Sequence, residues 1–458
     1  MDFNSSCLSL DCLIHIFAFL EEDDLIRASG VCKVWHEAAE TPWLWRQMCL
    51  QRWTFCNVTR TDCGKRTWKR YYQQRSKLES RMETGRSGAD YTCKSLRGHS
   101  GSIIGLVYLV SNSDQNEVWN SAPVVCSAST DGTVRAWDAQ QGVQLWATPA
   151  QAPFVTSQWI LTWGSCSPVT SQGGSLPGRS CQDRKWPLSS RPPPDAGCWL
   201  TSTEGQSAVM VGTSGGWNQV VYDTFKIDPL IASPDKKWVF TATKENFDMS
   251  PKVFSSESLI CPSEDGSPLC QSVPVSGCHA AAFMPSEPAR IALIHSGEDW
   301  HSNTVSIFDI STKKSKYETG ISVQQVESFQ LATSRGSDVL LQTRGSDTLV
   351  VAMANTLRVY TSKGVMLASF EDHTQPIAAL CVDSFRVVTA SRDLSLRVLT
   401  WKKERDRGLT LQSKFHLLGG SHSMSRGFTK VACDYVSIVA SVQAVDGNDV
   451  LKAYSFNS

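Results

Sequence analysis

Two short motifs match part of the residue spacing of catalytic sites. Gly212-Thr-Ser-Gly-Gly216 has the G-x-S-x-G pattern, in which a serine, here Ser214, would act as the nucleophile of a hydrolase. That geometry requires a helix after the motif, whereas residues 217–223 have the composition of a strand. His36-Glu-Ala-Ala-Glu40 matches the zinc motif HExxH only in part, because glutamate replaces the second histidine. We therefore expect a turn at Ser214, and no catalytic residue, metal site or cofactor.

Four polar residues further along the chain have a spacing that suits a buried hydrogen-bond network. His99 can bond to the carboxylate of Asp131, which lies in an Asp-Gly sequence typical of a tight turn. The hydroxyl of Ser127 and the indole N–H of Trp137 would complete the chain. We expect this tetrad to stabilise the fold.

Arg392, in Ala390-Ser-Arg-Asp393, is the candidate for contact with a bound partner. A guanidinium offers a planar set of donors that fits a carboxylate or a phosphate. The alternative interpretation is an ordinary surface arginine in a turn between strands. Arg335 and Arg344, in the repeated sequence Arg-Gly-Ser-Asp, are further candidates of the same kind.

The length and composition indicate a globular protein of several domains or of repeated units. The chain has 458 residues, of which 41% are hydrophobic and 19% charged, so a buried core is expected. Its 44 basic and 44 acidic residues cancel, which argues against nucleic acid or a membrane as a partner. The 16 cysteines are scattered without a CxxC pair, and we expect neither a secretory signal nor a transmembrane span. These features indicate reduced thiols in a cytoplasmic or nuclear protein.

The first 50 residues have the pattern of a small helical module. Apolar residues recur three or four apart from Leu10 to Leu20, which predicts a helix with one broad apolar face. Carboxylates at positions 21–24 suit the start of a second helix, and Thr41-Pro42 suits the end of a third and the start of a fourth. Three or four helices in about 45 residues make a small core, so we expect a permanent partner.

The same residues resemble the F-box family. The match comprises Leu8-Ser-Leu-Asp-Cys-Leu-Ile-His-Ile-Phe-Ala-Phe-Leu20, Asp24-Leu25, Ser29-Gly-Val-Cys-Lys-Val-Trp35 and Leu44-Trp45. One departure is Ser9, where the family has proline at the first helical turn, although serine is itself a good capping residue. The resemblance implies that the module binds the SKP-type adaptor of cullin-RING ubiquitin ligases. The residues that it implies for this contact are Leu8, Leu13, Ile16, Phe17, Leu20, Val31, Cys32 and Trp35.

A basic segment follows the module. Residues 51–90 carry ten basic and four acidic residues, and Trp68, Arg75, Leu78 and Met82 stand at helical spacing. Basic residues mixed with aromatic ones are also typical of nucleic-acid binding. We favour a connecting helix that packs through its aromatic side chains and holds the two flanking parts at a set distance.

From about residue 91 to the C-terminus, short runs of β-forming residues alternate with turn residues, which predicts an all-β region. The clearest unit, from Leu96-Arg-Gly-His99 to Trp137-Asp138, resembles a WD repeat. In weaker copies Phe308, Tyr360 and Leu399 stand in place of the tryptophan. The spacing of the strand ends favours a closed propeller of about seven blades.

Residues 160–200 do not fit this pattern. Their sequence, rich in Gly, Ser and Pro, has neither strand alternation nor a helical period. Two explanations stay open: an insertion loop, or a damaged blade that would compromise closure of the ring.

The chain as a whole is similar to the F-box/WD-repeat family, and within it to the divergent group around F-box and WD repeat protein 12. We expect an F-box in residues 1–50, a helical linker in 51–90 and a WD-repeat-like propeller in 91–458. The resemblance implies a non-catalytic substrate receptor of an SCF-type ligase, whose propeller holds an unknown protein substrate, phosphorylated or not. The alternatives are a WD-repeat scaffold that no longer assembles a ligase, and a hydrolase that uses Ser214.

Overall fold

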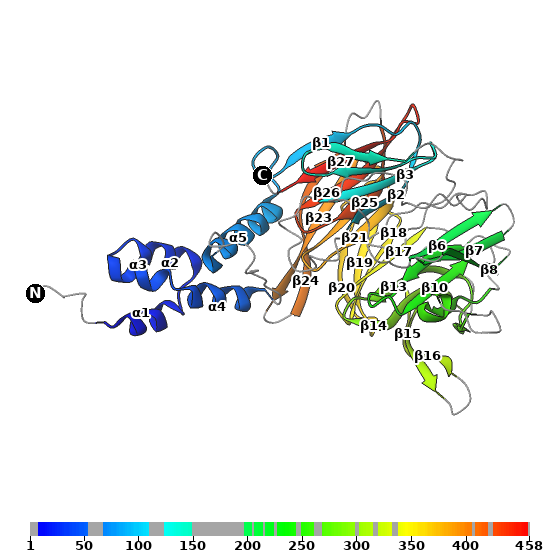
Figure 1. Ribbon diagram of the computed structural model, residues 1–458, viewed down its shortest axis with the longest axis horizontal. Helices are drawn as coiled ribbons and strands as arrows, with labels where there is room; N and C mark the ends of the chain where they lie inside the picture. Colours follow the sequence, from blue (N-terminus) through cyan, green and yellow to red (C-terminus); the bar gives the residue numbers. More distant parts are fainter. Residues whose placement is uncertain are drawn as a thin grey trace, which may run out of the picture.

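A short helical arm projects from a larger body of β-sheets (Figure 1). Helices come first along the chain and strands afterwards, which confirms the predicted fold class of a small all-α module before an all-β region. No helix in the described part of the chain is long and apolar enough to cross a membrane. The computed structural model describes residues 8–53, 67–109, 123–148, 197–203, 206–213, 216–223, 227–243, 249–260, 268–297, 302–314, 319–331, 338–404, 408–419 and 425–456.

Four short helices form the N-terminal module: α1 (Leu10–Phe17), α2 (Glu22–Ser29), α3 (Lys33–Ala39) and α4 (Pro42–Arg52). Each begins at a recognisable start signal or close to one. Ser9 caps α1, because its hydroxyl accepts a hydrogen bond from the backbone N–H of Cys12 at 3.3 Å. The serine that replaces the family's proline therefore fulfils a capping role. Three acidic residues stand in the first turn of α2, where they interact favourably with the helix dipole.

These helices enclose one small core. It contains Leu13 and Phe17 of α1 and Trp45 of α4, which are only 1–2% exposed. Tyr71 and Tyr72, from the helix that follows, complete the same core. The module is therefore packed against the next helix and shares its core with it.

Helix α5 (Trp68–Thr84) connects the module to the sheets and contributes to both cores. Leu78 and Met82, near its C-terminal end, pack among buried residues of the last two sheets. Gly85 ends the helix in the left-handed conformation, with φ +55°. A Cβ atom at this position would lie 2.3 Å from the ring of Phe415, so both the backbone and the close packing require glycine.

The described strands form seven antiparallel sheets, six of four strands and one of three, numbered here in chain order. Sheet 1 has β2 (Ile103–Leu109), β3 (Val124–Ser129), β4 (Val134–Asp138) and β5 (Val143–Ala147), and sheet 2 has β6 (Gly197–Thr203), β7 (Gln206–Thr213) and β8 (Gly216–Asp223). Sheet 3 has β9 (Ile227–Ala232), β10 (Trp238–Thr243), β11 (Lys252–Ser255) and β12 (Cys270–Ser272), and sheet 4 has β13 (Cys278–Met284), β14 (Glu287–Ser296), β15 (Asn303–Lys314) and β16 (Thr319–Leu331). Sheet 5 has β17 (Val339–Arg344), β18 (Thr348–Met353), β19 (Thr356–Thr361) and β20 (Met366–Phe370), and sheet 6 has β21 (Ile377–Val382), β22 (Arg386–Ser391), β23 (Ser395–Glu404) and β24 (Gly408–Leu418). Sheet 7 has β25 (Ser425–Cys433), β26 (Ser437–Ala444), β27 (Val450–Ser455) and β1 (Thr92–Leu96).

The first strand and the last strand of the chain pair with each other. β1 runs antiparallel to β27, with Thr92 opposite Ser455 and Leu96 opposite Leu451. The leading strands of neighbouring sheets, β9, β13, β17, β21, β25 and β2, contact one another in that order. Antiparallel sheets that contact one another through their leading strands, with one sheet built from both ends of the chain, are the architecture of a WD-type propeller.

Sheet 2 follows the stretch that the repeat pattern did not fit. β6 begins at Gly197, so nearly all of residues 160–200 lies outside the described residues, and both explanations of that stretch remain open. A short helix, α6 (Ser256–Ile260), contacts β7 and links sheet 2 to sheet 3.

Candidate functional site

The residues implied for adaptor binding divide between the surface and the core of the helical module. Leu8, Ile16 and Val31 expose 47%, 49% and 61% of their surface. Leu13 and Phe17 are buried in the core of the module, so they can shape the binding surface only from beneath. The remaining three are partly buried: Leu20, Cys32 and Trp35.

Further apolar side chains of the same module are exposed. Phe19, directly after α1, exposes 90% of its surface, and Val34 of α3 exposes 44%. The sequence pattern predicted Phe19 only as a residue that broadens the apolar face of the first helix. Exposed apolar patches of this kind mark interaction surfaces. We refer to six exposed apolar residues of the module together as the adaptor-side patch: Leu8, Leu10, Ile16, Phe19, Val31 and Val34.

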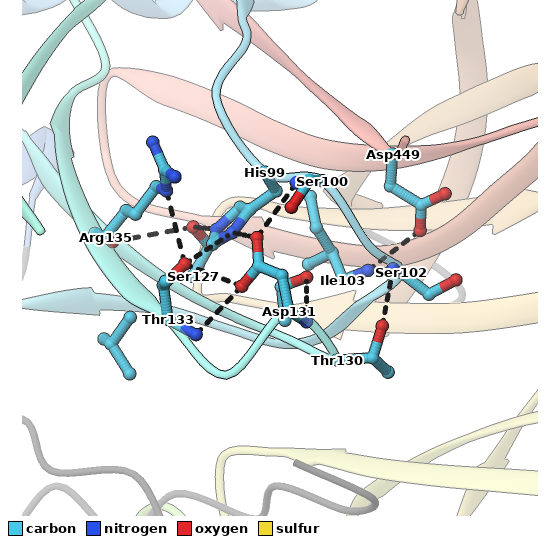
Figure 2. A network of polar contacts seen from close by, with 12 residues as sticks. His99, Ser100, Ser102, Ile103, Ser127, Thr130, Asp131, Thr133, Arg135 and Asp449 are labelled. Carbon is cyan, nitrogen blue, oxygen red and sulfur yellow. Dashed lines mark hydrogen bonds and ion pairs between the residues drawn. The ribbon is translucent and has the colours of Figure 1, made fainter. Parts of the chain in front are cut away.

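The four residues of the polar tetrad lie in one chain of hydrogen bonds, and three of them, His99, Ser127 and Asp131, are drawn in Figure 2. Asp131 lies in the turn between β3 and β4. His99 Nδ1 lies 3.0 Å from Asp131 Oδ2, and His99 Nε2 lies 2.8 Å from Ser127 Oγ. The indole of Trp137 donates to the same Ser127 oxygen at 2.8 Å. Asp131 also accepts the backbone N–H of Ser100 at 2.9 Å, so the carboxylate joins the turn to the segment before β2.

A second network of this kind lies in sheet 6. His373 Nδ1 lies 2.8 Å from Asp393 Oδ2, and His373 Nε2 lies 2.7 Å from Thr389 Oγ1. Thr389 takes the place that Ser127 has in sheet 1. The tryptophan position is occupied by Leu399, which is buried and offers no donor.

The pKa directions indicate a neutral imidazole beside an ionised carboxylate in both networks. Burial lowers the pKa of His99 and of His373, and the hydrogen bond to the aspartate opposes this effect. Burial opposes ionisation of Asp131, but hydrogen bonds from Thr133, Ser100 and His99 lower its pKa on balance. Both histidines are therefore held in hydrogen bonds that stabilise the turns.

Arg392 lies in the turn between β22 and β23, and its side chain is exposed. Its backbone packs against Gly427 near the start of β25, where a Cβ atom would lie 2.3 Å from Arg392 Cα. This contact brings the neighbouring exposed residue, Arg426, close to Arg392. Arg426 lies at an irregularity in the pairing of β25 with β26, and such bulges redirect side chains.

Sequence reasoning missed Arg426 because the two arginines belong to different sheets. The available signal was the sequence Arg426-Gly427-Phe428, because a glycine within a strand often marks a bulge. In the structure this Gly427 has φ +112°, a conformation that other residues rarely adopt.

The two arginines and the helical arm lie at opposite ends of sheets 6 and 7. Arg392 and Arg426 lie at the end where β22 finishes and β25 begins. Helix α5 contacts the other end, where Tyr435 joins β25 to β26 and Arg386 begins β22. The arginine-bearing end therefore points away from the helical module.

The structure also shows the surroundings of the two motifs that partly match catalytic and metal sites. Ser214 lies outside the described residues, but β8 begins at Gly216, so a strand follows the motif where a hydrolase needs a helix. His36 Nδ1 lies 3.2 Å from the carbonyl oxygen of Ser29. Within the described ranges, no group of three or more His, Cys, Asp or Glu side chains could hold a metal ion.

Two arginines were considered beside Arg392. Arg335 lies outside the described residues. Arg344 donates to the carbonyl oxygen of Ser384 at 2.9 Å and lies over the ring of Trp401, 4.8 Å from its centroid. Arg344 therefore joins sheet 5 to sheet 6.

Comparison with known proteins agrees with this architecture. The F-box-like family profile matches residues 10–51, and the profile of the WD domain, G-beta repeat, matches residues 91–138. A helical F-box-like segment followed by a WD-type propeller resembles the F-box/WD-repeat proteins, which are in general non-catalytic adaptors. A role in ubiquitin ligases is typical of F-box proteins.

The similarity to individual relatives extends over nearly the whole chain. F-box/WD repeat-containing protein 12 of Homo sapiens is 29% identical over 97% of this chain and 98% of its own length. F-box/WD repeat-containing protein 15 of Mus musculus is 23% identical over 98% and 99%. The predicted resemblance to F-box/WD-repeat proteins and to the group around protein 12 is thus confirmed.

Among solved structures, the crystal structure of the computationally designed Ika8 protein superposes with a TM-score of 0.50. The alignment covers 79% of this chain and 98% of that chain at 18% identity. At this identity the likeness concerns the fold alone.

Proposed function

We propose that this protein is the substrate-recognition subunit of an SCF-type cullin-RING ubiquitin ligase. The helical module docks the SKP-type adaptor, and the propeller binds a target protein in the cytoplasm or nucleus. Ubiquitin transfer then follows from the proximity of the target to the ubiquitin-charged enzyme, without a catalytic group from this chain.

The observation that carries this proposal is the adaptor-side patch. The core of the module is already complete, yet Phe19 and Val31 remain 90% and 61% exposed. Burying one large apolar side chain contributes about 1.5–3 kcal/mol, so a partner that covers the patch gains substantial free energy. This supports a permanent protein partner at the F-box-like segment.

The proposal is tested by placing a carboxylate in the patch. Ile16→Asp and Val31→Asp leave the core of the module intact, whereas Leu13→Asp would disrupt it, because Leu13 is buried. An unpaired carboxylate at the interface costs several kcal/mol when it is desolvated, on the order of a hundredfold in affinity or more. We expect both variants to lose the SKP-type adaptor in co-purification.

The matched control is Val143→Asp. Val143 is similarly exposed, at 52%, but lies on the outer strand of sheet 1. It should retain the adaptor. Full retention by both patch variants would contradict the proposal and favour the WD-repeat scaffold that assembles no ligase.

On the propeller, we assign the contact with the target to Arg392, with Arg426 as its neighbour. Both are exposed and lie at the end of the sheets that points away from the helical module. Guanidinium groups suit an acidic or phosphorylated side chain, and the backbone of Gly427, next to Arg426, packs against that of Arg392. Asp393 is occupied by His373 and Ser395, which leaves the neighbouring arginine available to a partner.

This assignment predicts weaker recovery of target proteins by Arg392→Ala and by Arg426→Ala. Losing one charge-assisted hydrogen bond costs about 1.5–3 kcal/mol, on the order of tenfold to a hundredfold in affinity. Phosphatase treatment should reproduce the loss if the group is a phosphate. Lys363→Ala, an exposed basic residue in another turn, is the control, and adaptor recovery should not change. Equal target recovery in all samples would show that Arg392 does not contact the target and is an ordinary surface residue.

A further inference from the structure

A single buried carboxylate, that of Glu79 on α5, joins the helical module to the propeller. Glu79 is 8% exposed. Its Oε1 accepts a hydrogen bond from the indole of Trp53, at the end of α4, at 2.6 Å. The same oxygen accepts the hydroxyl of Tyr435, between β25 and β26, at 2.7 Å. One oxygen atom therefore holds one residue of the module and one of the propeller.

Arg75, one helical turn earlier, bridges the same two residues a second time. Its Nε donates to the Tyr435 hydroxyl at 2.9 Å and lies 3.7 Å from Glu79 Oε1. Its guanidinium lies 4.5 Å from the ring centroid of Trp53 and 5.2 Å from that of Tyr435. Cation–π contacts at this range are attractive and gain strength when the groups are shielded from water.

The polar contacts continue into the helical module without a break. Arg52 Nη2 lies 3.2 Å from Glu79 Oε2, and Arg52 Nη1 donates to Ser76 Oγ at 3.0 Å. Ser76 in turn donates to Glu22 of α2 at 3.0 Å. A connected network of this kind extends from α2 to the turn of sheet 7, and its members depend on one another.

This network requires a protonated Tyr435 hydroxyl, and the surroundings of Tyr435 favour that state. Burial, followed by the neighbouring Glu79 carboxylate, raises the pKa of Tyr435 well above its ordinary value. The hydroxyl therefore remains a donor to Glu79 throughout the physiological pH range.

We propose that Glu79 is the positioning residue that fixes the orientation of the helical module relative to the propeller. Without its carboxylate, Trp53 and Tyr435 lose their common acceptor, and Arg52 and Arg75 lose a buried counter-charge. Water reaches the buried members of this set more easily when the junction opens, so we expect the module to swing about α5. The consequence for ubiquitin transfer rests on the proposed function, but the orientation itself does not.

The orientation is tested by small-angle X-ray scattering of the full chain. Glu79→Ala removes both acceptor oxygens, and Tyr435→Phe removes one donor from the propeller side while keeping the ring. Both should broaden the distribution of maximum dimensions. Glu79→Gln keeps an acceptor oxygen for Trp53 and Tyr435 and should restore much of the parent profile. Glu83→Ala, an exposed position on the same helix, should match the parent.

Folding is verified by circular dichroism, and Tyr435→Phe carries the test if Glu79→Ala does not fold. Parent-like scattering from both variants in the folded state would overturn the proposal. Broadened scattering supports it.

The functional consequence is measured as the rate of ubiquitin transfer to the propeller of this chain. The chain is first assembled with an SKP-type adaptor, a cullin and a RING subunit. Glu79→Ala should lower the transfer rate by about threefold or more, because misplacement of reactants slows a proximity-driven reaction. Its affinity for the adaptor should stay within about twofold of the parent. Unchanged transfer despite broadened scattering would overturn the role of Glu79 in transfer, whereas failure of the parent to bind the adaptor would contradict only the proposed function.

Discussion

At the scale of single residues, the networks around His99 and His373 differ in two side chains of the tetrad, because Thr389 replaces Ser127 and Leu399 replaces Trp137. In sheet 1, Trp137 donates to Ser127 and continues the chain of hydrogen bonds. In sheet 6, Leu399 replaces the tryptophan and packs among buried apolar residues of sheets 5 and 6. The histidine and aspartate are retained in both, because they join the turn to the segment that precedes the sheet.

The network around Asp131 should contribute measurably to stability. Asp131→Ala removes the acceptor of His99, Ser100 and Thr133, and each unsatisfied buried donor is unfavourable. We expect a loss of about 1–3 kcal/mol and a lower melting temperature of the full chain. Asp446→Ala makes the same chemical change in an exposed turn and should alter the melting temperature far less. Equal melting of the two variants would exclude a structural role for the tetrad.

The buried histidines also predict how stability depends on pH. Burial lowers the pKa of His99 and His373 in the folded state, so the unfolded chain binds protons more readily near its own pKa of about 6.5. Their contribution is therefore complete above about pH 6.5 and is lost as the pH falls through the folded-state values. Melting temperatures measured from pH 7.5 to 5 should decrease. A His99→Gln, His373→Gln variant should show a shallower decrease, and a parent that gains stability on acidification would refute this assignment.

At the scale of the elements, the sequence identified those whose pattern is local. The helical period predicted the helix that contains Leu13 and Phe17, and Thr41-Pro42 marked the start of α4. The strand run that ends near Tyr360 appears as β19, and the one at Phe308 appears as β15, which continues beyond the predicted end to Lys314. The sequence could not separate surface from core along α1, because its apolar residues occupy more than one face.

The end of α5 is an element boundary whose geometry can be tested. Gly85→Ala would place a Cβ atom 2.3 Å from the Phe415 ring and force a left-handed conformation on alanine. We expect the left-handed conformation to lower the free energy of unfolding by about 1–2 kcal/mol, and the overlap with the ring to lower it by about 1–3 kcal/mol more. Chemical unfolding measures this loss.

Gly88→Ala separates these two contributions. Gly88 also has a positive φ, +76°, but no atom lies within 4 Å of the position that a Cβ atom would take there. Gly88→Ala should therefore lower the free energy of unfolding only by the cost of the left-handed conformation. If both variants lost the same free energy, contact between Gly85 and Phe415 would have no energetic role.

At the scale of the whole molecule, the decisive contacts join residues far apart in the chain. Pairing of β1 with β27 closes the last sheet, and Glu79 meets Tyr435 across the junction with the helical module. Neither contact has a local sequence signal, because each depends on where the propeller brings its two ends. For the same reason Arg426 could not be placed beside Arg392 before the sheets were arranged.

This arrangement also separates the two proposed binding surfaces. The adaptor-side patch lies on the helical arm, and the arginines lie at the end of the sheets that points away from α5. Variants at one surface should therefore leave binding at the other unchanged, since sites without shared contacts act independently.

The central claim is that one chain binds both a ligase adaptor and a target protein. Affinity purification of the full chain from cells treated with a proteasome inhibitor, followed by mass spectrometry, tests it most directly. We predict recovery of an SKP-type adaptor, a cullin and at least one ubiquitinated protein, with adaptor and cullin absent from the Ile16→Asp purification. Recovery of propeller partners from the parent without adaptor or cullin would contradict the account and identify the protein as a scaffold outside the ligase.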